Sequence, residues 1–132
     1  MKAGAAADRL FSAAGKKYEA ALKIKPDFHE ALKNWGAALL DQAEQKEDSQ
    51  RNSLLTLAVE KFHAAESLVP GSGSYNLACG HALLGDEEKC KKWLNACLDT
   101  GKLPGRDHLQ NDTDLDSVRN KQWFKKLIAS LE

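Results

Sequence analysis

The sequence predicts an all-α fold in which pairs of helices stack on one another. Apolar residues recur at spacings of three and four through most of the chain, and almost no stretch alternates with the period of two typical of strands. One segment repeats 44 residues later, counted from Pro26 to Pro70: Tyr18-x-x-Ala21-x4-Pro26 returns as Phe62-x-x-Ala65-x4-Pro70. A second match has an offset of 42 residues and joins Asn34-Trp35-Gly36-Ala37 to Asn76-Leu77-Ala78-Cys79. Two repeated segments with a connection of variable length indicate pairs of packed helices, one pair per repeat.

The first half of the chain predicts three helices. Residues 8–26 form the first, and residues 28–46 form the second, with an apolar stripe of Leu32, Trp35, Ala38, Leu39 and Ala43. Asp27 and Glu30 have the spacing of a capping box for the second helix. Residues 51–68 form the third, with Leu54, Leu55, Ala58, Phe62, Ala65 and Leu68 in the same periodicity, and Pro70 ends it.

The second half predicts a further pair and a tail. Residues 74–84 form a helix that ends before Gly85, which suits a left-handed cap. Asp86 caps a helix over 87–100, and Gly101 ends it. Residues 101–112 are rich in turn residues and predict a loop, after which Thr113-x-x-Asp116 predicts the cap of one short turn through Arg119. A final amphipathic helix carries Trp123, Phe124, Leu127, Ile128 and Leu131, and we expect it to cover the open apolar edge of the last repeat.

Composition limits the class of protein. The 132 residues fit one domain, and the 19 Lys and Arg residues balance the 19 Asp and Glu residues, which argues against nucleic-acid binding. No apolar run approaches the length of a membrane span, and no secretory signal pattern follows Met1. Three cysteines, Cys79, Cys90 and Cys97, do not suggest a disulfide framework. We therefore expect a cytoplasmic protein that binds neither nucleic acid nor membrane.

The repeats resemble the tetratricopeptide repeat (TPR) family. Gly36 and Ala78 occupy its Gly/Ala position in the first helix, with bulky residues before them. The second helix of the family has two small-residue positions, filled here by Ala58 and Cys90 and by Ala65 and Cys97. Phe62 and Leu94 occupy the position between them, and Pro26 and Pro70 occupy the proline position that ends the repeat. The resemblance covers roughly residues 8–101 and implies a right-handed α-solenoid.

The resemblance also divides the chain, which we expect to be one TPR-like domain over residues 1–132. Residues 8–26 are the second helix of a partial repeat, 27–70 an extended repeat, 71–101 the last repeat, and 102–132 a loop with capping helices. The repeat over 27–70 is longer than the usual 34-residue period, and we expect residues 41–52 to extend the helix hairpin or to loop out of it. The sequence of these repeats resembles long bacterial arrays of extended repeats, and we expect the chain to be the C-terminal end of such an array.

In such a solenoid the first helices line a concave wall that binds a peptide or a partner helix. The resemblance therefore implies a protein-interaction scaffold whose binding residues are Lys33, Ala37, Leu40, Asp41, Tyr75, Asn76, Cys79 and Leu83, with Ala82 beside them. Some relatives hold a C-terminal carboxylate with a clamp of Lys and Asn side chains. Lys33 and Asn76 have comparable positions, but Ala37 and Cys79 replace polar clamp residues, so we expect the complete clamp to be absent.

Other functions have weaker support in the sequence. Cys79, His81, Cys90 and Cys97 lack the short paired spacing of a zinc site, and His81 is expected to be packed and hydrogen-bonded. No motif for a nucleophile, a metalloprotease or a phosphate loop occurs, so we expect no enzyme activity, metal or cofactor. The main alternative is a structural accessory domain of a larger multidomain enzyme. We also expect an apolar N-terminal edge, formed by Leu10, Phe11, Tyr18 and Leu22, that favours self-association.

Overall fold

The computed structural model describes the backbone of residues 2–131 and the side chains of residues 6–131. None of these residues lies in a strand, so the predicted all-α class is confirmed. The helices within this range are α1 (Lys2–Ile24), α2 (His29–Glu44), α3 (Asp48–Leu68), α4 (Ser74–Leu83), α5 (Glu87–Thr100), α6 (Arg106–Asn111), the short 3-10 helix η1 (Thr113–Leu115) and α7 (Gln122–Ala129). None of the described helices combines the length and the apolarity that crossing a membrane requires.

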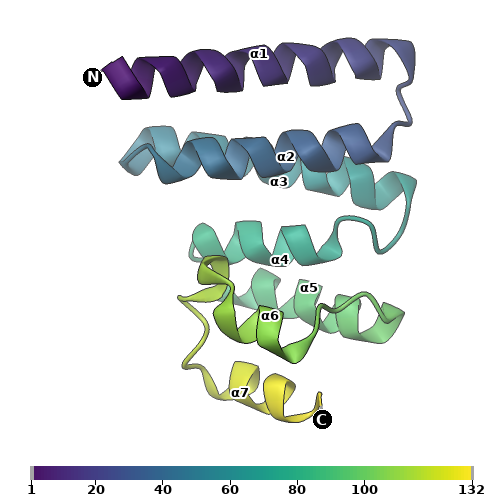
Figure 1. Ribbon diagram of the computed structural model, residues 1–132. Helices are drawn as coiled ribbons and strands as arrows, with labels where there is room; N and C mark the ends of the chain where they lie inside the picture. Colours follow the sequence, from purple (N-terminus) through teal and green to yellow (C-terminus); the bar gives the residue numbers. More distant parts are fainter. Residues whose placement is uncertain (1, 132) are drawn as a thin grey trace.

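The helices form a stack of antiparallel neighbours (Figure 1). The α1 helix lies along α2, and α2 and α4 form a front layer with α3 and α5 behind them. Both α2 and α4 begin at the right of Figure 1, so they run in the same direction. The α2–α3 pair is long because α2 continues to Glu44 and α3 begins already at Asp48, which extends the hairpin as the 41–52 segment predicted.

The Phe62 ring fixes how α2, α3 and α4 pack. Phe62 is fully buried on α3, and a Cβ built on Gly36 of α2 would lie only 2.4 Å from its Cε1 atom. A Cβ on Gly73, just before α4, would lie 2.5 Å from the Phe62 carbonyl oxygen. A Cβ at either position would force the ring or the backbone of Phe62 to shift, so glycine permits the close packing seen here. Ala78 is also fully buried, so both Gly/Ala positions of the repeat are tight helix contacts.

A second core joins the α4–α5 pair to the tail. Cys90 and Leu94 of α5 and Ala78 of α4 pack in one apolar cluster with Leu109, Leu115, Val118 and Phe124. All of these tail side chains are at most 2% exposed. The final helix thus covers the apolar edge of the last pair as predicted, and the segment between Leu109 and Ile128 contributes buried side chains to this core.

Three local predictions at helix ends were wrong. Asp27 does not cap α2, whose N-cap is Phe28 with no side-chain hydrogen bond. Residues 106–111 form the helix α6 rather than a loop. The reason is that Leu109 is buried in one cluster with residues of α4 and α5, a contact between distant parts of the chain that no local pattern indicates. Asp112 rather than Thr113 caps the next turn, accepting a hydrogen bond from the backbone N of Asp114 at 3.0 Å.

Other predicted helix ends are confirmed. The Asp86 side chain caps α5 by accepting a hydrogen bond from the backbone N of Lys89. Gly85 and Gly101 both have positive φ, at 82° and 72°, where glycine lacks the steric penalty of other residues. At the N-terminal edge, Tyr18 stacks on Trp35, whereas Leu10 is 73% exposed. The edge is therefore partly covered by α2, and its self-association stays a prediction.

The Gly36 contact predicts opposite effects of one substitution at two helical glycines. Gly36→Ala should lower the free energy of unfolding by about 1–2 kcal/mol, because overpacking against Phe62 outweighs the gain in helix propensity. Gly15→Ala in α1 is the matched control, since its Cβ would lie 3.6 Å from the nearest atom, Nε1 of Trp35. It should raise the free energy of unfolding by up to about 1 kcal/mol. Urea unfolding of both variants measures this, and a stabilised Gly36→Ala variant would contradict the packing argument.

Candidate functional site

A polar pocket of about 470 Å³ lies where the first turns of α2 and α4 meet the loop after α3. Lys33 of α2 and Tyr75 and Asn76 of α4 line it, and all three are half-buried. The remaining lining residues are His29, the loop residues Val69, Pro70, Gly71 and Ser72, and Lys102 from the segment after α5. The pocket thus brings together side chains that are far apart in the sequence.

The loop that forms one wall of the pocket is held by α3. The Glu66 carboxylate accepts hydrogen bonds from the backbone N of Gly71 at 2.8 Å and of Gly73 at 2.9 Å. The Ser72 hydroxyl donates to the carbonyl oxygen of Ala65 at 3.0 Å. Gly71 has a φ of 91°, and the Lys102 side chain packs over it, with Cγ only 3.1 Å from where a Cβ would lie. The wall is therefore fixed before any ligand binds.

The pocket favours an anion. Neither Lys33 nor Lys102 makes an ion pair or hydrogen bond with another described residue, and His29 adds a third nitrogen-bearing side chain. The N-termini of α2 and α4, whose N-cap residues make no side-chain cap, add the positive partial charge of free backbone N–H groups. The Glu66 carboxylate, which supports this wall, is already engaged by two backbone N–H groups.

The predicted binding residues separate into three groups. Lys33, Tyr75 and Asn76 line the pocket together. Ala37 and Asp41 are exposed farther along α2, whereas Leu40 is 9% exposed and belongs to the core. The last group lies under or beside the tail and contains Cys79, Ala82 and Leu83.

The tail packs along α4 from Tyr75 near its start to Ala82 near its end, where the sequence predicted an open groove. The Tyr75 hydroxyl donates to Oδ2 of Asp112 at 2.5 Å, and the Ser117 hydroxyl donates to the Ala82 carbonyl oxygen at 3.1 Å. Cys79 and Ala82 are each only 3% exposed. The chain's own tail packs over these two side chains, so their role as ligand contacts stays a prediction.

Arg119 ties the tail segment together. Its guanidinium donates to the carbonyl oxygens of Leu109, Gln110 and Asp112, and it pairs with the Asp116 carboxylate at 2.8 Å. One side chain thus satisfies the last carbonyl groups of α6, which would otherwise lack partners. This internal network and the buried Leu109 and Leu115 hold the tail against α4.

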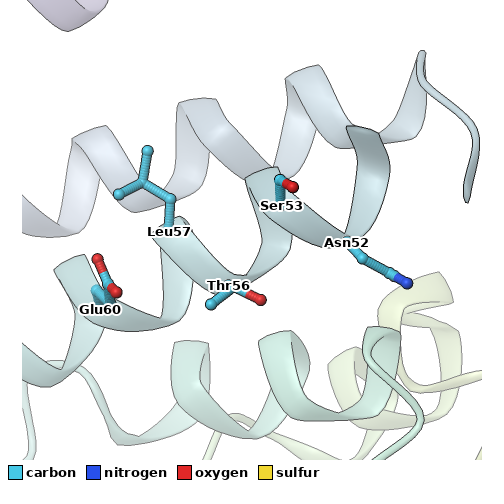
Figure 2. A pocket seen from close by; sticks show the side chains of 5 residues that line it. All are labelled: Asn52, Ser53, Thr56, Leu57 and Glu60. Carbon is cyan, nitrogen blue, oxygen red and sulfur yellow. The ribbon is translucent and has the colours of Figure 1, made fainter. Parts of the chain in front are cut away.

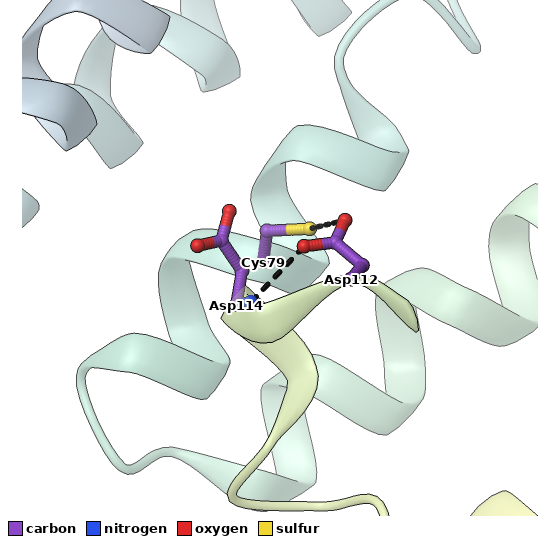
Figure 3. A group of neighbouring side chains, drawn as sticks. All are labelled: Cys79, Asp112 and Asp114. Atoms are coloured by element: carbon purple, nitrogen blue, oxygen red, sulfur yellow. Dashed lines mark hydrogen bonds between the residues drawn. The ribbon is translucent and has the colours of Figure 1, made fainter. Parts of the chain in front are cut away.

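Cys79, Asp112 and Asp114 form the one group of potential metal ligands found among the described residues (Figure 3). One ligand atom from each lies within 4.8 Å of the others. The Asp112 carboxylate already accepts hydrogen bonds from Tyr75, from the Cys79 thiol at 3.8 Å and from the Asp114 backbone. Burial raises the pKa of Cys79, which keeps the thiol protonated and a poor ligand. The group acts as a hydrogen-bonded anchor of the tail.

His81 is packed as predicted, but it is not hydrogen-bonded. It is 6% exposed between α3 and α5, near His63 and Trp93, and neither of its ring nitrogens has a partner among the described residues. Burial lowers its pKa, so the ring is neutral near pH 7. The nearby charge of Asp86 opposes this shift but does not outweigh the effect of burial.

Another hollow, of about 490 Å³, lies along α3 (Figure 2). Its lining comes from a single helix and consists of Asn52, Ser53, Thr56, Leu57 and Glu60. Figure 2 shows these side chains spread along the helix without converging on a common point. This hollow offers no set of groups that could bind one ligand, unlike the pocket between α2 and α4.

Comparison with protein-family models finds no match, and comparison with curated proteins and with solved structures finds no significant match either. The pocket is therefore interpreted from its own residues. The sequence identified Lys33, Tyr75 and Asn76 but missed His29 and Lys102. His29 begins α2 beside the predicted wall, and Lys102 follows the last repeat in a segment without periodicity, so no pattern indicated it.

Asp114 gives the tail contact a predictable pH dependence. Its burial, and then the charges of Asp112, Glu44, Asp41 and Asp116, raise its pKa from 3.8 to about 6. The folded protein therefore binds the Asp114 proton more tightly than the unfolded chain does. This contribution to stability is present below pH 3.8 and is lost as the pH rises through 6.

Asp114→Asn removes the ionisation and should raise the melting temperature at pH 7.5 but not at pH 4. Thermal unfolding of both proteins across this range measures the difference. Asp107→Asn removes an exposed carboxylate from the same segment and controls for the general effect of charge. An Asp114→Asn gain that is equal at both pH values would show that Asp114 does not hold a raised pKa.

Proposed function

We propose that this chain is a protein-interaction module that binds an acidic peptide segment in the pocket between α2 and α4. The observation that carries the proposal is the convergence of Lys33, Lys102 and His29 on one pocket without an ion-pair partner among the described residues. A cluster of lysines does not stabilise the folded protein, because like charges repel one another. A cluster next to two helix N-termini suits a carboxylate ligand.

The other lining groups suit a polypeptide. The Asn76 amide both donates and accepts hydrogen bonds and can pair with a peptide backbone, while Pro70 and Val69 offer apolar contact. The Ser72 hydroxyl is engaged by a backbone carbonyl, so it is not paired with a base as a nucleophile would be. These features support binding rather than catalysis.

The stacked helix pairs support a TPR-like solenoid as the scaffold of this module. Repeated spacing, the Gly36–Phe62 contact and the parallel course of α2 and α4 all agree with that proposal. In such a scaffold the first helices of successive repeats share one wall, and the pocket lies on this wall between two of them.

Peptide titration tests the function. The probe is a blocked peptide of seven residues with two adjacent glutamates, and its control has glutamines in their place. Shifts of the backbone amide signals of Asn76 and Gly71 in NMR spectra should report binding of the acidic probe alone. Lys33→Ala and Asn76→Ala should each weaken it about tenfold, as expected for loss of a hydrogen bond to a charged group.

Lys16→Ala, which removes an exposed lysine from α1, is the matched control and should leave the affinity unchanged. Equal weakening by Lys16→Ala would indicate nonspecific attraction to positive charge. Equal binding of the glutamate and glutamine probes, or binding of neither, would reject the pocket as an acidic-peptide site and would favour the structural accessory role.

A further inference from the structure

The face that contains the pocket is positive at one end and negative at the other. Because α2 and α4 run in the same direction, their N-termini lie together at the pocket and their C-termini lie together at the opposite end (Figure 1). The two helix dipoles therefore add to each other along this face. The cations Lys33 and Lys102 stand at the positive end of the dipoles.

Acidic side chains from two elements meet at the other end. Asp41 and Glu44 belong to the last turn of α2, while Asp114 and Asp116 come from the tail that packs on α4. The charges of Asp41 and Glu44 are close enough to raise the pKa of Asp114. Asp114, Asp116 and the half-buried Leu83 line a hollow of about 280 Å³ there, together with one cation, Arg51.

Helix stability does not account for this distribution. Acidic residues are unfavourable at the C-terminal end of a helix, and cations are unfavourable near its N-terminal end. In α2, Glu30 in the first turn follows this preference, whereas Asp41 and Glu44 in the last turn, where no basic residue is present, do not. At the C-terminal end the side-chain charges thus reinforce the helix dipole instead of compensating it, which suits a surface that faces a cationic group.

The separation of the two ends defines the ligand. Lys33 and Glu44 are eleven positions apart on one helix, which at a rise of about 1.5 Å per residue corresponds to roughly 16 Å. An extended peptide covers this distance in about five residues, at roughly 3.3 Å each. The exposed Ala37 between the two ends leaves the wall smooth enough for a backbone to approach.

We propose that this face binds an extended polypeptide segment of bipolar charge, with an acidic side chain in the pocket and a Lys or Arg side chain about five residues away between Asp41, Glu44 and Asp114. This inference rests on the proposed function and adds the second charge and the spacing. The partner is recognised by two opposite charges at a fixed distance, so a segment with both charges close together does not fit.

Four blocked peptides test the inference by NMR titration. The acidic probe carries two glutamates and neutral residues, and the bipolar probe adds two lysines five residues away. The third peptide is the bipolar sequence in reverse order, and the fourth places the lysines two residues from the glutamates. The bipolar probe in one chain direction should bind about tenfold more tightly than the acidic probe, and the closely spaced peptide should show no such gain.

Substitutions separate this inference from the proposed function. Asp41→Asn combined with Glu44→Gln should remove the gain of the bipolar probe and leave the affinity of the acidic probe unchanged. Asp99→Asn, an exposed acid on α5, is the matched control and should preserve the gain. The charge of Asp114 is left intact in all of these variants, so the tail contact is not altered directly.

Each outcome decides one of the two proposals. If the acidic probe binds and none of the bipolar peptides binds more tightly, the bipolar inference is wrong and the acidic-peptide function stands. A gain that survives the Asp41→Asn, Glu44→Gln double substitution, or one that is independent of spacing, also overturns the inference. If no peptide binds, both proposals fail.

Discussion

The close approach of two glycines to the buried Phe62 is the constraint on which the rest of this structure depends. Gly36 lets α2 lie against the ring, and Gly73 lets the start of α4 lie against the Phe62 backbone. A protein interior is packed too densely to accept an extra carbon at a 2.4 Å distance. These two contacts with Phe62 set the order of α2, α3 and α4 in the stack and the spacing between them.

The proposed function depends on the same contacts, because they set the positions of the helix ends. With α2 and α4 held side by side and running in the same direction, their N-termini converge with the Glu66-anchored loop to form the pocket. The same arrangement aligns the helix dipoles and separates the lysines at one end from the acids at the other. The tail packs on α4, so the face that we propose for peptide binding is the surface that α2 and the first turn of α4 leave open.

The sequence predicts what depends on local pattern. Helix positions, the tight contacts at Gly36 and Ala78, and the caps at Asp86 and Gly101 follow from periodicity and from the conformational preferences of single residues. The fold-back of α6 onto α4 could not be predicted, because Leu109 becomes buried only through partners distant in the sequence. For the same reason the burial of Cys79 and the place of Lys102 in the pocket were missed, whereas Lys33 and Asn76 were found from the repeat.

The most direct test of this account is the NMR chemical shift of the Gly36 Hα protons. A Cβ on Gly36 would be 2.4 Å from Cε1 and equally distant, at 2.8 Å, from the two ring carbons beside it, Cδ1 and Cζ, so this direction meets the face of the ring. The proton that points there should be shifted strongly upfield by the ring current, and Phe62→Leu should abolish the shift. Two Gly36 Hα signals at ordinary helical positions in the unmodified protein would contradict the Gly36–Phe62 contact and, with it, the arrangement of the stack.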